Sequence, residues 1–272
     1  MRAALVQLCS GDDPAANLTV TRGFVDEAAR SGASLILTPE VTNCVSTSRT
    51  RQEAVLQHEA DDQTLAALRD AARDHGVWIS IGSLALKTDD PDGRFANRSF
   101  LIDPAGEVRG RYDKIHMFDV DVSETERYRE SAGYRPGERA VLVDTDLARI
   151  GLTICYDVRF AYLYRSLAQA GAEIITVPAA FSTGTGPGHW EVLLRARAIE
   201  TGAYILAAAQ TGQNTDKRAT YGHSLAIAPW GEVIADAGTD PGVTLVDLDL
   251  ATVEKSRQRI PALNHDRSFE SP

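Results

Sequence analysis

Short apolar runs alternate with amphipathic stretches along this 272-residue chain, and that alternation is what most limits its fold. Apolar runs at residues 3–8, 35–37 and 77–84 enclose two segments with helical spacing, at 15–31 and 62–75, and a glycine follows each helical segment as a stop signal. A β-α-β-α-β order favours parallel strands covered by helices over a barrel of strands alone. We therefore predict an α/β protein.

The second half of the chain repeats this order. Predicted strands at residues 149–154, 173–177 and 203–209 enclose predicted helices at 160–170 and 189–201. Two such halves could pack as separate units or as one body. No linker rich in Pro, Gly or Ser divides them, so we expect a single domain over residues 1–272.

Two predicted hairpins resemble each other. Residues 99–108 (SFLIDPAGEV) can be laid over residues 224–233 (SLAIAPWGEV), with Pro and Gly at matching positions of a tight turn. Hairpins with Pro-x-Gly-Glu turns also arise by chance, and this interpretation stays open. The alternative is two α-β halves related by a pseudo-twofold axis, which would form a four-layer domain.

Charge and cysteine content limit the partners. A formal net charge of −10 argues against nucleic acid, which is bound by clustered Lys and Arg. No apolar stretch is long enough to cross a bilayer, so we expect no membrane partner, and the apolar run at 3–8 is too short for a signal peptide. Three cysteines do not predict a disulfide framework. The expected location is the reducing cytoplasm, where thiols stay free.

Cys155 directly follows the predicted strand at 149–154. Reactive groups collect at the carboxyl ends of strands in open α/β sheets. A nucleophile on a sharp turn there also lies beside backbone N–H groups that can hold an oxyanion. A cysteine packed as a small hydrophobe is the alternative, and position alone leaves both open. Cys9 and Cys44 lack such a setting, and we expect both to pack in the core.

Glu40 and Lys114 complete a chemical set with Cys155. Glu40 ends an apolar run, where desolvation is expected to raise the pKa of its carboxyl and let it act as a base. Lys114 lies among aromatic and aliphatic residues, and taken alone each side chain also fits the surface. Together they offer a nucleophile, a proton shuttle and a cation that favours the thiolate and stabilises a tetrahedral intermediate. This set fits hydrolysis of an amide.

Three motifs recur in the order and spacing of a known signature: TPE at 38–40, YDKIH at 112–116 and ICYDVRF at 154–160. They resemble the Glu-Lys-Cys signature of the nitrilase superfamily of carbon–nitrogen hydrolases, over nearly the whole chain. The resemblance implies an α-β-β-α sandwich, in agreement with the two-half interpretation. It also implies Glu40 as general base, Lys114 as oxyanion stabiliser and Cys155 as the residue that forms a thioester.

The resemblance implies two supporting groups and an assembly. The backbone N–H of Tyr156 would be a second oxyanion donor. Many members carry a further glutamate between the lysine and cysteine motifs, and Glu130, in residues 128–131 (YRES), occupies the matching place. A solvated surface carboxylate is the alternative for Glu130. The family also implies a homodimer or a larger homo-oligomer.

The sequence after Cys155 indicates which branch of the superfamily the chain resembles. Residues 178–201, 207–212 and 221–224 look like the Nit branch, and within it like the deaminated glutathione amidases more than the omega-amidases that act on 2-oxoglutaramate. The expected partners are thus a small carboxylate-bearing amide and water. Local cations have to hold the carboxylates, and Arg159 is the best-placed candidate, with an ion pair to a neighbouring carboxylate as the alternative. Phe181 and Thr183 are candidates for lining the pocket.

Other functions stay open. A Cys-His dyad could use His189 or His223 to activate Cys155. The same residues could hydrolyse a nitrile, and a scaffold or binding protein could keep the fold without catalysis. We expect no metal and no cofactor, because the six histidines show no ligand spacing and no glycine-rich phosphate loop occurs.

Overall fold

Two six-stranded sheets form the centre of the computed structural model, which describes residues 1–122 and 127–271. The first sheet contains, in spatial order, β16 (Gly242–Asp247), β1 (Arg2–Gln7), β2 (Leu35–Leu37), β3 (Trp78–Leu86), β4 (Ala96–Ile102) and β5 (Val108–Asp113). The second contains β15 (Val233–Asp236), β14 (Leu225–Ile227), β11 (Tyr204–Ala207), β10 (Ile174–Thr176), β9 (Arg149–Leu152) and β8 (Val141–Asp144).

The two sheets are built alike. Three parallel strands form the middle of each, β1-β2-β3 in the first and β9-β10-β11 in the second. An antiparallel strand, β16 or β8, borders them on one side, and an antiparallel hairpin, β4-β5 or β14-β15, on the other. The two hairpins contain the matching Pro-x-Gly turns, with Gly106 at φ 79° and Gly231 at φ 96°. The predicted pseudo-twofold relation is confirmed.

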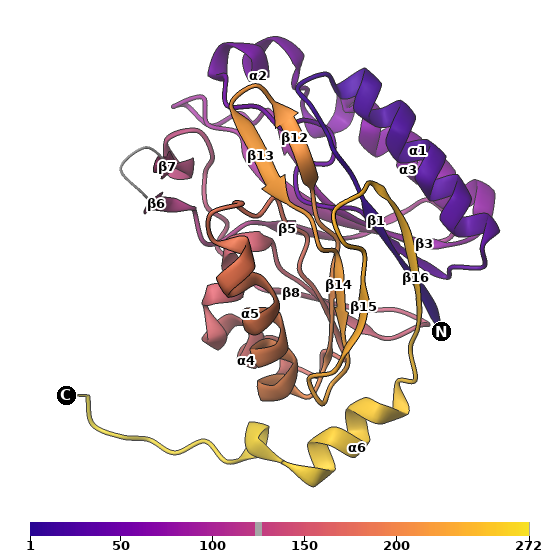
Figure 1. Ribbon diagram of the computed structural model, residues 1–272, viewed down its shortest axis with the longest axis vertical. Coiled ribbons are helices and arrows are strands. Elements are labelled where there is room, and N and C mark those ends of the chain that lie inside the picture. Colours follow the sequence, from indigo (N-terminus) through magenta and orange to yellow (C-terminus); the bar gives the residue numbers. More distant parts are fainter. Residues whose placement is uncertain (123–126, 272) are drawn as a thin grey trace.

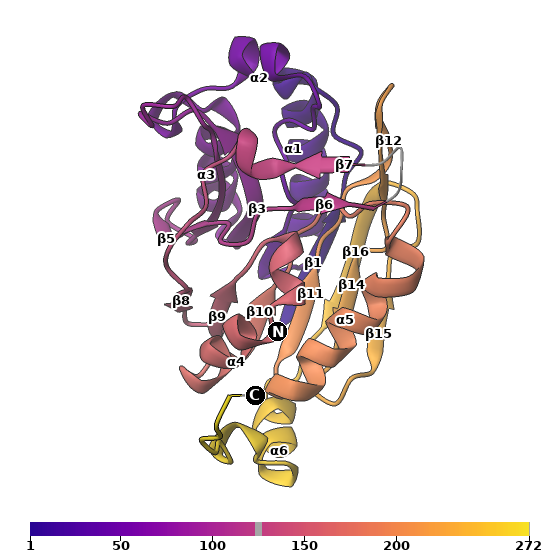
Figure 2. The same ribbon diagram turned by 90° about the vertical axis from the view of Figure 1, so that its left-hand side faces the viewer.

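Helices cover the outer face of each sheet (Figure 1). The first sheet carries α1 (Pro14–Arg30) and α3 (Gln63–His75), and the second carries α4 (Ala161–Gln169) and α5 (Gly186–Thr201). Two further helices lie outside these layers, α2 (Arg49–Val55) and α6 (Ala251–Arg259), the latter close to the C-terminus (Figure 2). The predicted α-β-β-α order is confirmed. No helix among the described residues is both long and apolar enough to cross a bilayer.

Side chains that alternate along each buried strand pack into apolar clusters on both faces of the sheet. In β1, Ala3 and Leu5 pack into the cluster shared with the second sheet, whereas Ala4 and Val6 pack into the cluster that includes residues of α1 and α3. Successive side chains of a strand point to opposite faces, so a wholly apolar strand is buried on both. This is why the parallel strands appear in the sequence as short continuous apolar runs.

Irregular segments gather at the carboxyl ends of the parallel strands. They include the hairpins β6 (Asp119–Asp121)-β7 (Arg127–Arg129) and β12 (Thr211–Thr215)-β13 (Arg218–Tyr221), and the 3₁₀ turns η1 (Glu59–Asp61), η2 (Glu130–Ala132) and η3 (Cys155–Arg159). One more 3₁₀ turn, η4 (Ala262–Asn264), follows α6. Glu40 and Cys155 lie in the segments that follow β2 and β9, so the topology brings both to this edge.

Candidate active site

A cavity of about 460 Å³ lies at this edge. Six of the eight site residues expected from the sequence line it: Glu40, Lys114, Glu130, Cys155, Tyr156 and Phe181. Arg159 and Thr183 are not among its described lining residues. Residues from five separate segments therefore meet around one space.

Tight backbone geometry fixes the two segments that carry Glu40 and Cys155. A Cβ atom on Gly82 of β3 would lie 2.1 Å from the carbonyl oxygen of Thr38, so only glycine lets this strand pass so close. Cys155 has φ 47°, in the left-handed region that non-glycine residues rarely adopt. Its N–H donates to the Pro178 carbonyl at 2.8 Å. Strained conformations of this kind cluster at functional sites.

Glu40 is almost fully buried, and its carboxylate is held on both sides. Oε1 accepts from Lys114 Nζ at 2.8 Å and from Asn97 Nδ2 at 2.9 Å. Oε2 accepts from the backbone N–H of Ala180 at 2.8 Å. The carboxylate is therefore oriented by three elements, β4, the segment after β5 and the segment after β10.

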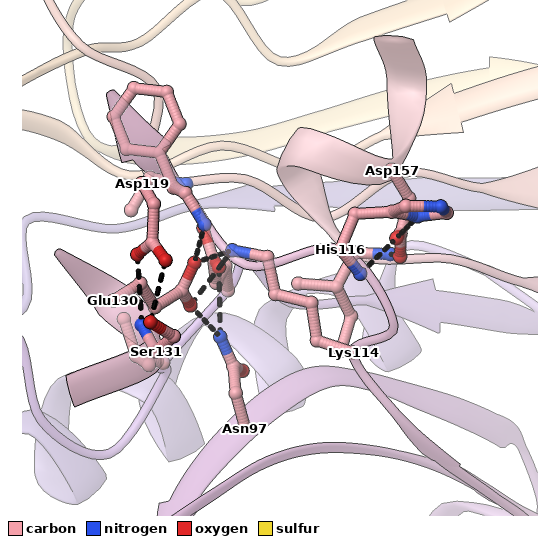
Figure 3. A network of polar contacts seen from close by, with 12 residues as sticks. Asn97, Lys114, His116, Asp119, Glu130, Ser131 and Asp157 are labelled. Carbon is pink, nitrogen blue, oxygen red and sulfur yellow. Dashed lines mark hydrogen bonds and ion pairs between the residues drawn. The ribbon is translucent and has the colours of Figure 1, made fainter. Parts of the chain in front are cut away.

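Lys114 bridges Glu40 and Glu130. Its Nζ donates to both carboxylate oxygens of Glu130, at 2.8 and 2.9 Å, and Figure 3 shows the ammonium pointing at this carboxylate. Glu130 also accepts from the Phe118 N–H at 2.7 Å and from Asn97 Nδ2 at 3.3 Å. Its side chain is only 14% exposed, so the alternative of a solvated surface carboxylate does not describe it.

The electrostatics differ from the sequence-based expectation. Burial acts to raise the pKa of Glu40, but the charge and hydrogen bond of Lys114 outweigh it, so the pKa lies below the ordinary value. The expected rise was wrong because it considered desolvation without the ammonium. Burial acts to lower the pKa of Lys114, and the carboxylates of Glu130 and Glu40 raise it well above its usual range. The carboxylate and the ammonium therefore stay charged.

Cys155 carries a neutral thiol rather than a thiolate. Burial raises the pKa of the thiol well above its ordinary value, and the nearby Glu40 carboxylate adds to the rise. Lys114 acts in the opposite direction, as expected, but does not prevail. A neutral thiol beside an ionised carboxylate is a nucleophile that needs its proton removed during attack.

Hydrogen-bond donors face the space beside the thiol. The N–H groups of Cys155 and Asp157 donate to backbone carbonyls, whereas the N–H of Tyr156 has no acceptor among the described residues. Tyr156 and Lys114 both line the cavity. An oxygen that gains negative charge next to Cys155 could therefore accept hydrogen bonds from both groups.

Arg159 is not among the described lining residues of the cavity, and its binding of a substrate carboxylate stays a prediction. Its guanidinium donates to Nδ1 of His189 at 3.1 Å and lies 5.8 Å from the ring centroids of Tyr156 and Phe181. The cation thus lies close to two side chains that line the cavity. Among the described residues it has no carboxylate within ion-pair distance, and its polar partner is His189 of α5.

The structure argues against a Cys-His dyad. His189 contacts Arg159, and His223 contacts the Asp236 carboxylate at 3.0 Å. Neither histidine belongs to the described cavity lining. The described residues contain no group of three or more side chains suited to a metal ion.

The expectation for the other two cysteines was half right. Cys44 is buried, and it packs with Leu56, Ala85 and Phe95. Cys9 is exposed, although Leu8 and Ser10 on either side of it are buried.

Three residues that contribute to the site were not predicted from the sequence. Asn97, the second residue of β4, donates to both glutamates, but Arg98 and Ser99 follow it, so no isolated amide in an apolar run marked it in the sequence. Ala180 acts through its backbone N–H, which no side-chain pattern reveals. Arg218 lines the cavity from the β12-β13 hairpin, and its separation of 63 positions from Cys155 gave no hint of proximity.

Fold and cavity together define a class. An α-β-β-α sandwich of pseudo-twofold halves, with a glutamate, a lysine and a cysteine in one cavity, is the arrangement of the nitrilase superfamily. A family model described as Carbon-nitrogen hydrolase matches residues 2–258, and the chain belongs to this family. It is a carbon–nitrogen hydrolase enzyme of the amidase type.

Related proteins and solved structures agree with this family assignment. The chain is 40% identical over 269 residues to the deaminated glutathione amidase of Yersinia enterocolitica, covering 98% of this chain and 93% of that protein. The crystal structure of the Caenorhabditis elegans NitFhit protein matches 98% of this chain and 65% of that one, with a TM-score of 0.90 and 34% identity. A glutamate-to-glutamine mutant of the amidase from Nesterenkonia sp. AN1 matches 96% and 98%, with a TM-score of 0.78 and 28% identity. In that structure acrylamide has added to the active site cysteine.

Proposed function

We propose that this protein hydrolyses the amide bond of a small carboxylate-bearing substrate through a thioester on Cys155. Glu40 is the general base, and Lys114 and the Tyr156 N–H stabilise the oxyanion. Glu130 positions Lys114. The observation that carries this proposal is a buried, neutral thiol beside an ionised carboxylate that is itself paired with an ammonium.

The steps follow from these protonation states. Glu40 takes the thiol proton as sulfur attacks the amide carbon, and the carbonyl oxygen becomes an oxyanion that accepts hydrogen bonds from Lys114 and Tyr156. The C–N bond then breaks, the leaving amine takes the proton from Glu40, and the acyl group stays on Cys155 as a thioester. Water attacks next, with Glu40 accepting one of its protons. The thioester breaks to give a carboxylic acid and the free thiol.

Deaminated glutathione is the substrate we propose. It offers an amide bond between a 2-oxo dicarboxylic acid and a dipeptide, and the Yersinia relative is named for its hydrolysis. The reactive cysteine of the Nesterenkonia amidase supports the same role for Cys155. Omega-amides such as 2-oxoglutaramate, and simple nitriles, are the competing substrates.

Mass spectrometry of acid-quenched reactions tests this function. We expect the peptide that contains Cys155 to gain the mass of the acyl half of deaminated glutathione within one turnover, and Cys155→Ala to show neither adduct nor turnover. Faster acylation of Cys155 by 2-oxoglutaramate or by a nitrile would mean that this compound, and not deaminated glutathione, represents the substrate. An adduct on another residue, or turnover by Cys155→Ala, would overturn the mechanism.

We also propose that residues 1–272 act as a single domain, in a homo-oligomer, in the reducing cytoplasm. Strand β16, near the C-terminus, pairs with β1, and one apolar cluster spans both sheets, which supports a single domain. Exposed apolar side chains on α5 and around β15 support self-association: Val192, Ile199, Trp230, Val233 and Ile234. Light scattering coupled to size exclusion tests the oligomer.

A further inference from the structure

Two neighbouring cations line the cavity where the hairpin β12-β13 turns. Lys217 is exposed, and Arg218 is half-buried at the start of β13. The guanidinium of Arg218 donates from Nη2 to the Ala180 carbonyl at 2.7 Å and lies 4.9 Å from the ring centroid of Tyr128. Within the described part of the chain, neither cation has a carboxylate within ion-pair distance. So far as the structure describes the chain, no carboxylate compensates either charge beside the cavity.

One nitrogen of Arg218 lacks a partner. Nη1 is buried and makes no hydrogen bond to any described residue. A guanidinium offers five N–H donors in a planar fork that matches a carboxylate. Since buried donors are nearly always satisfied, the free edge of this fork calls for an acceptor from outside the protein.

The position of Arg218 relative to Glu40 is fixed by one peptide unit. The N–H of Ala180 donates to Glu40 Oε2, and the carbonyl of the same residue accepts from Arg218. The guanidinium is thus anchored next to the reacting groups and faces the same cavity. A substrate with its amide at Cys155 would carry a carboxylate a few bonds away within reach of this cation.

Charge balance makes such a cation necessary. The reacting groups comprise two carboxylates and one ammonium, and the whole chain carries a formal net charge of −10, so an anionic substrate is repelled without local compensation. Arg127 and Arg129 also line the cavity, but Asp121 lies 3.8 and 2.8 Å from them. Arg218 and Lys217 have no such neighbour among the described residues.

We propose that Arg218, assisted by Lys217, binds a carboxylate of the substrate and so sets the preference for acidic amides. This inference rests on the proposed function, because it requires an amide to react with Cys155 in this cavity. Arg218 replaces Arg159, the cation favoured by the sequence, as the specificity-determining residue.

The test compares Arg218→Gln with Arg159→Gln on two substrates, deaminated glutathione and its neutral dimethyl ester. For Arg218→Gln we expect KM for the diacid to rise roughly 30- to 100-fold, the loss of a charge-assisted pair, with kcat changed less than about threefold. The neutral ester should lose no efficiency. Arg218→Lys should recover part of the loss. In Arg159→Gln the ratio of kcat/KM for the two substrates should match wild type.

Three results separate the possible failures. If both substrates lose efficiency equally in Arg218→Gln, or if only Arg159→Gln changes the ratio, the carboxylate site is wrong while the proposed function stands. If the wild type forms no acyl-enzyme with either amide, the proposed function itself fails. Should Arg218→Gln unfold, Lys217→Gln at the exposed neighbouring position serves instead, with an expected rise in KM of roughly two- to fivefold for the diacid only. An unchanged KM there would overturn the inference.

Discussion

Two buried polar clusters lie next to Cys155, and both take a residue from the segment that follows β5. The cavity cluster consists of Glu40, Asn97, Lys114 and Glu130. The elbow cluster consists of Tyr112, His116, Ile154 and Asp157. Figure 3 shows the His116–Asp157 pair on the side of Lys114 away from Glu130. Both clusters are buried and charged, but only the cavity cluster lines the cavity in the described structure.

The difference lies in what each carboxylate holds. Asp157 accepts from the Tyr112 hydroxyl at 2.6 Å, from the Ile154 N–H at 2.8 Å, and from the backbone N–H and Nδ1 of His116 at 3.1 and 2.6 Å. These donors tie the turn that bears Cys155 to the segment that bears Lys114. Glu40 instead faces a thiol and an open space. Charge and burial alone therefore do not distinguish chemistry from scaffolding, whereas access to a cavity does.

The largest effect is expected in the cavity cluster. Glu40→Gln keeps the shape of the side chain but removes the proposed base, so kcat should fall by about 10²- to 10⁴-fold, the typical contribution of general-base catalysis. Stability should change by only about 1–2 kcal/mol, because Lys114 keeps its pair with Glu130. Steady-state kinetics and chemical denaturation measure both. Glu130→Gln, which leaves the base intact, is the matched control and should cost less. Retention of a tenth of the activity by Glu40→Gln would disprove its role.

In the elbow cluster we expect a substitution to lower stability more than catalysis. Asp157→Asn cannot accept from all four donors and leaves buried groups unpaired, so the free energy of unfolding should fall by about 2–4 kcal/mol. Activity should fall less than in Glu40→Gln, because no reacting group is removed. His116→Gln, which keeps the backbone N–H bond to Asp157, should have a milder effect. Loss of activity with unchanged stability would place Asp157 in the chemistry and erase the distinction between the clusters.

Much of this comparison was visible in the sequence, and some of it was not. The strands, the flanking helices and the convergence of Glu40, Lys114 and Cys155 follow from apolar periodicity and from three motifs in register. The roles of Ala180 and Arg218 could not be predicted, because one acts through its backbone and the other arrives on a distant hairpin.

The misjudged pKa of Glu40 has a related cause. Desolvation can be inferred from a position next to an apolar strand, but the effect of an ion pair requires knowing that Lys114 lies 2.8 Å away. The role expected for Arg159 stays a prediction, and proximity to Cys155 in the chain did not give it a place among the described lining residues of the cavity. The sequence motifs predicted that a glutamate, a lysine and a cysteine lie together. Only the structure showed whether their interactions raise or lower the pKa of each group.

The depressed pKa of Glu40 predicts a smaller, pH-dependent effect. Because the folded-state pKa lies below the ordinary 4.5, the ionised carboxylate stabilises the fold above that pH. This contribution is lost as the pH falls through the folded-state value. The stability advantage of wild type over Glu40→Gln should therefore be constant from about pH 5 to 7 and shrink below about pH 4.5. Denaturation curves across this range measure it, and an advantage that instead grows as the pH falls from neutral would mean a raised pKa.

The smallest expected effect concerns Cys44, a second thiol on the wall of the same cavity. Burial raises its pKa to about 12, and it packs against apolar side chains rather than a base. Iodoacetamide should therefore alkylate Cys155 at neutral pH and leave Cys44 unmodified, and Cys44→Ala should keep kcat within about threefold while losing about 1 kcal/mol of stability. Glu40→Gln should slow alkylation of Cys155, because the neutral thiol loses the base that takes its proton. Equal labelling of both thiols would mean that access to the cavity alone makes a cysteine reactive. The Glu40 carboxylate would then not be needed to explain the reactivity of Cys155.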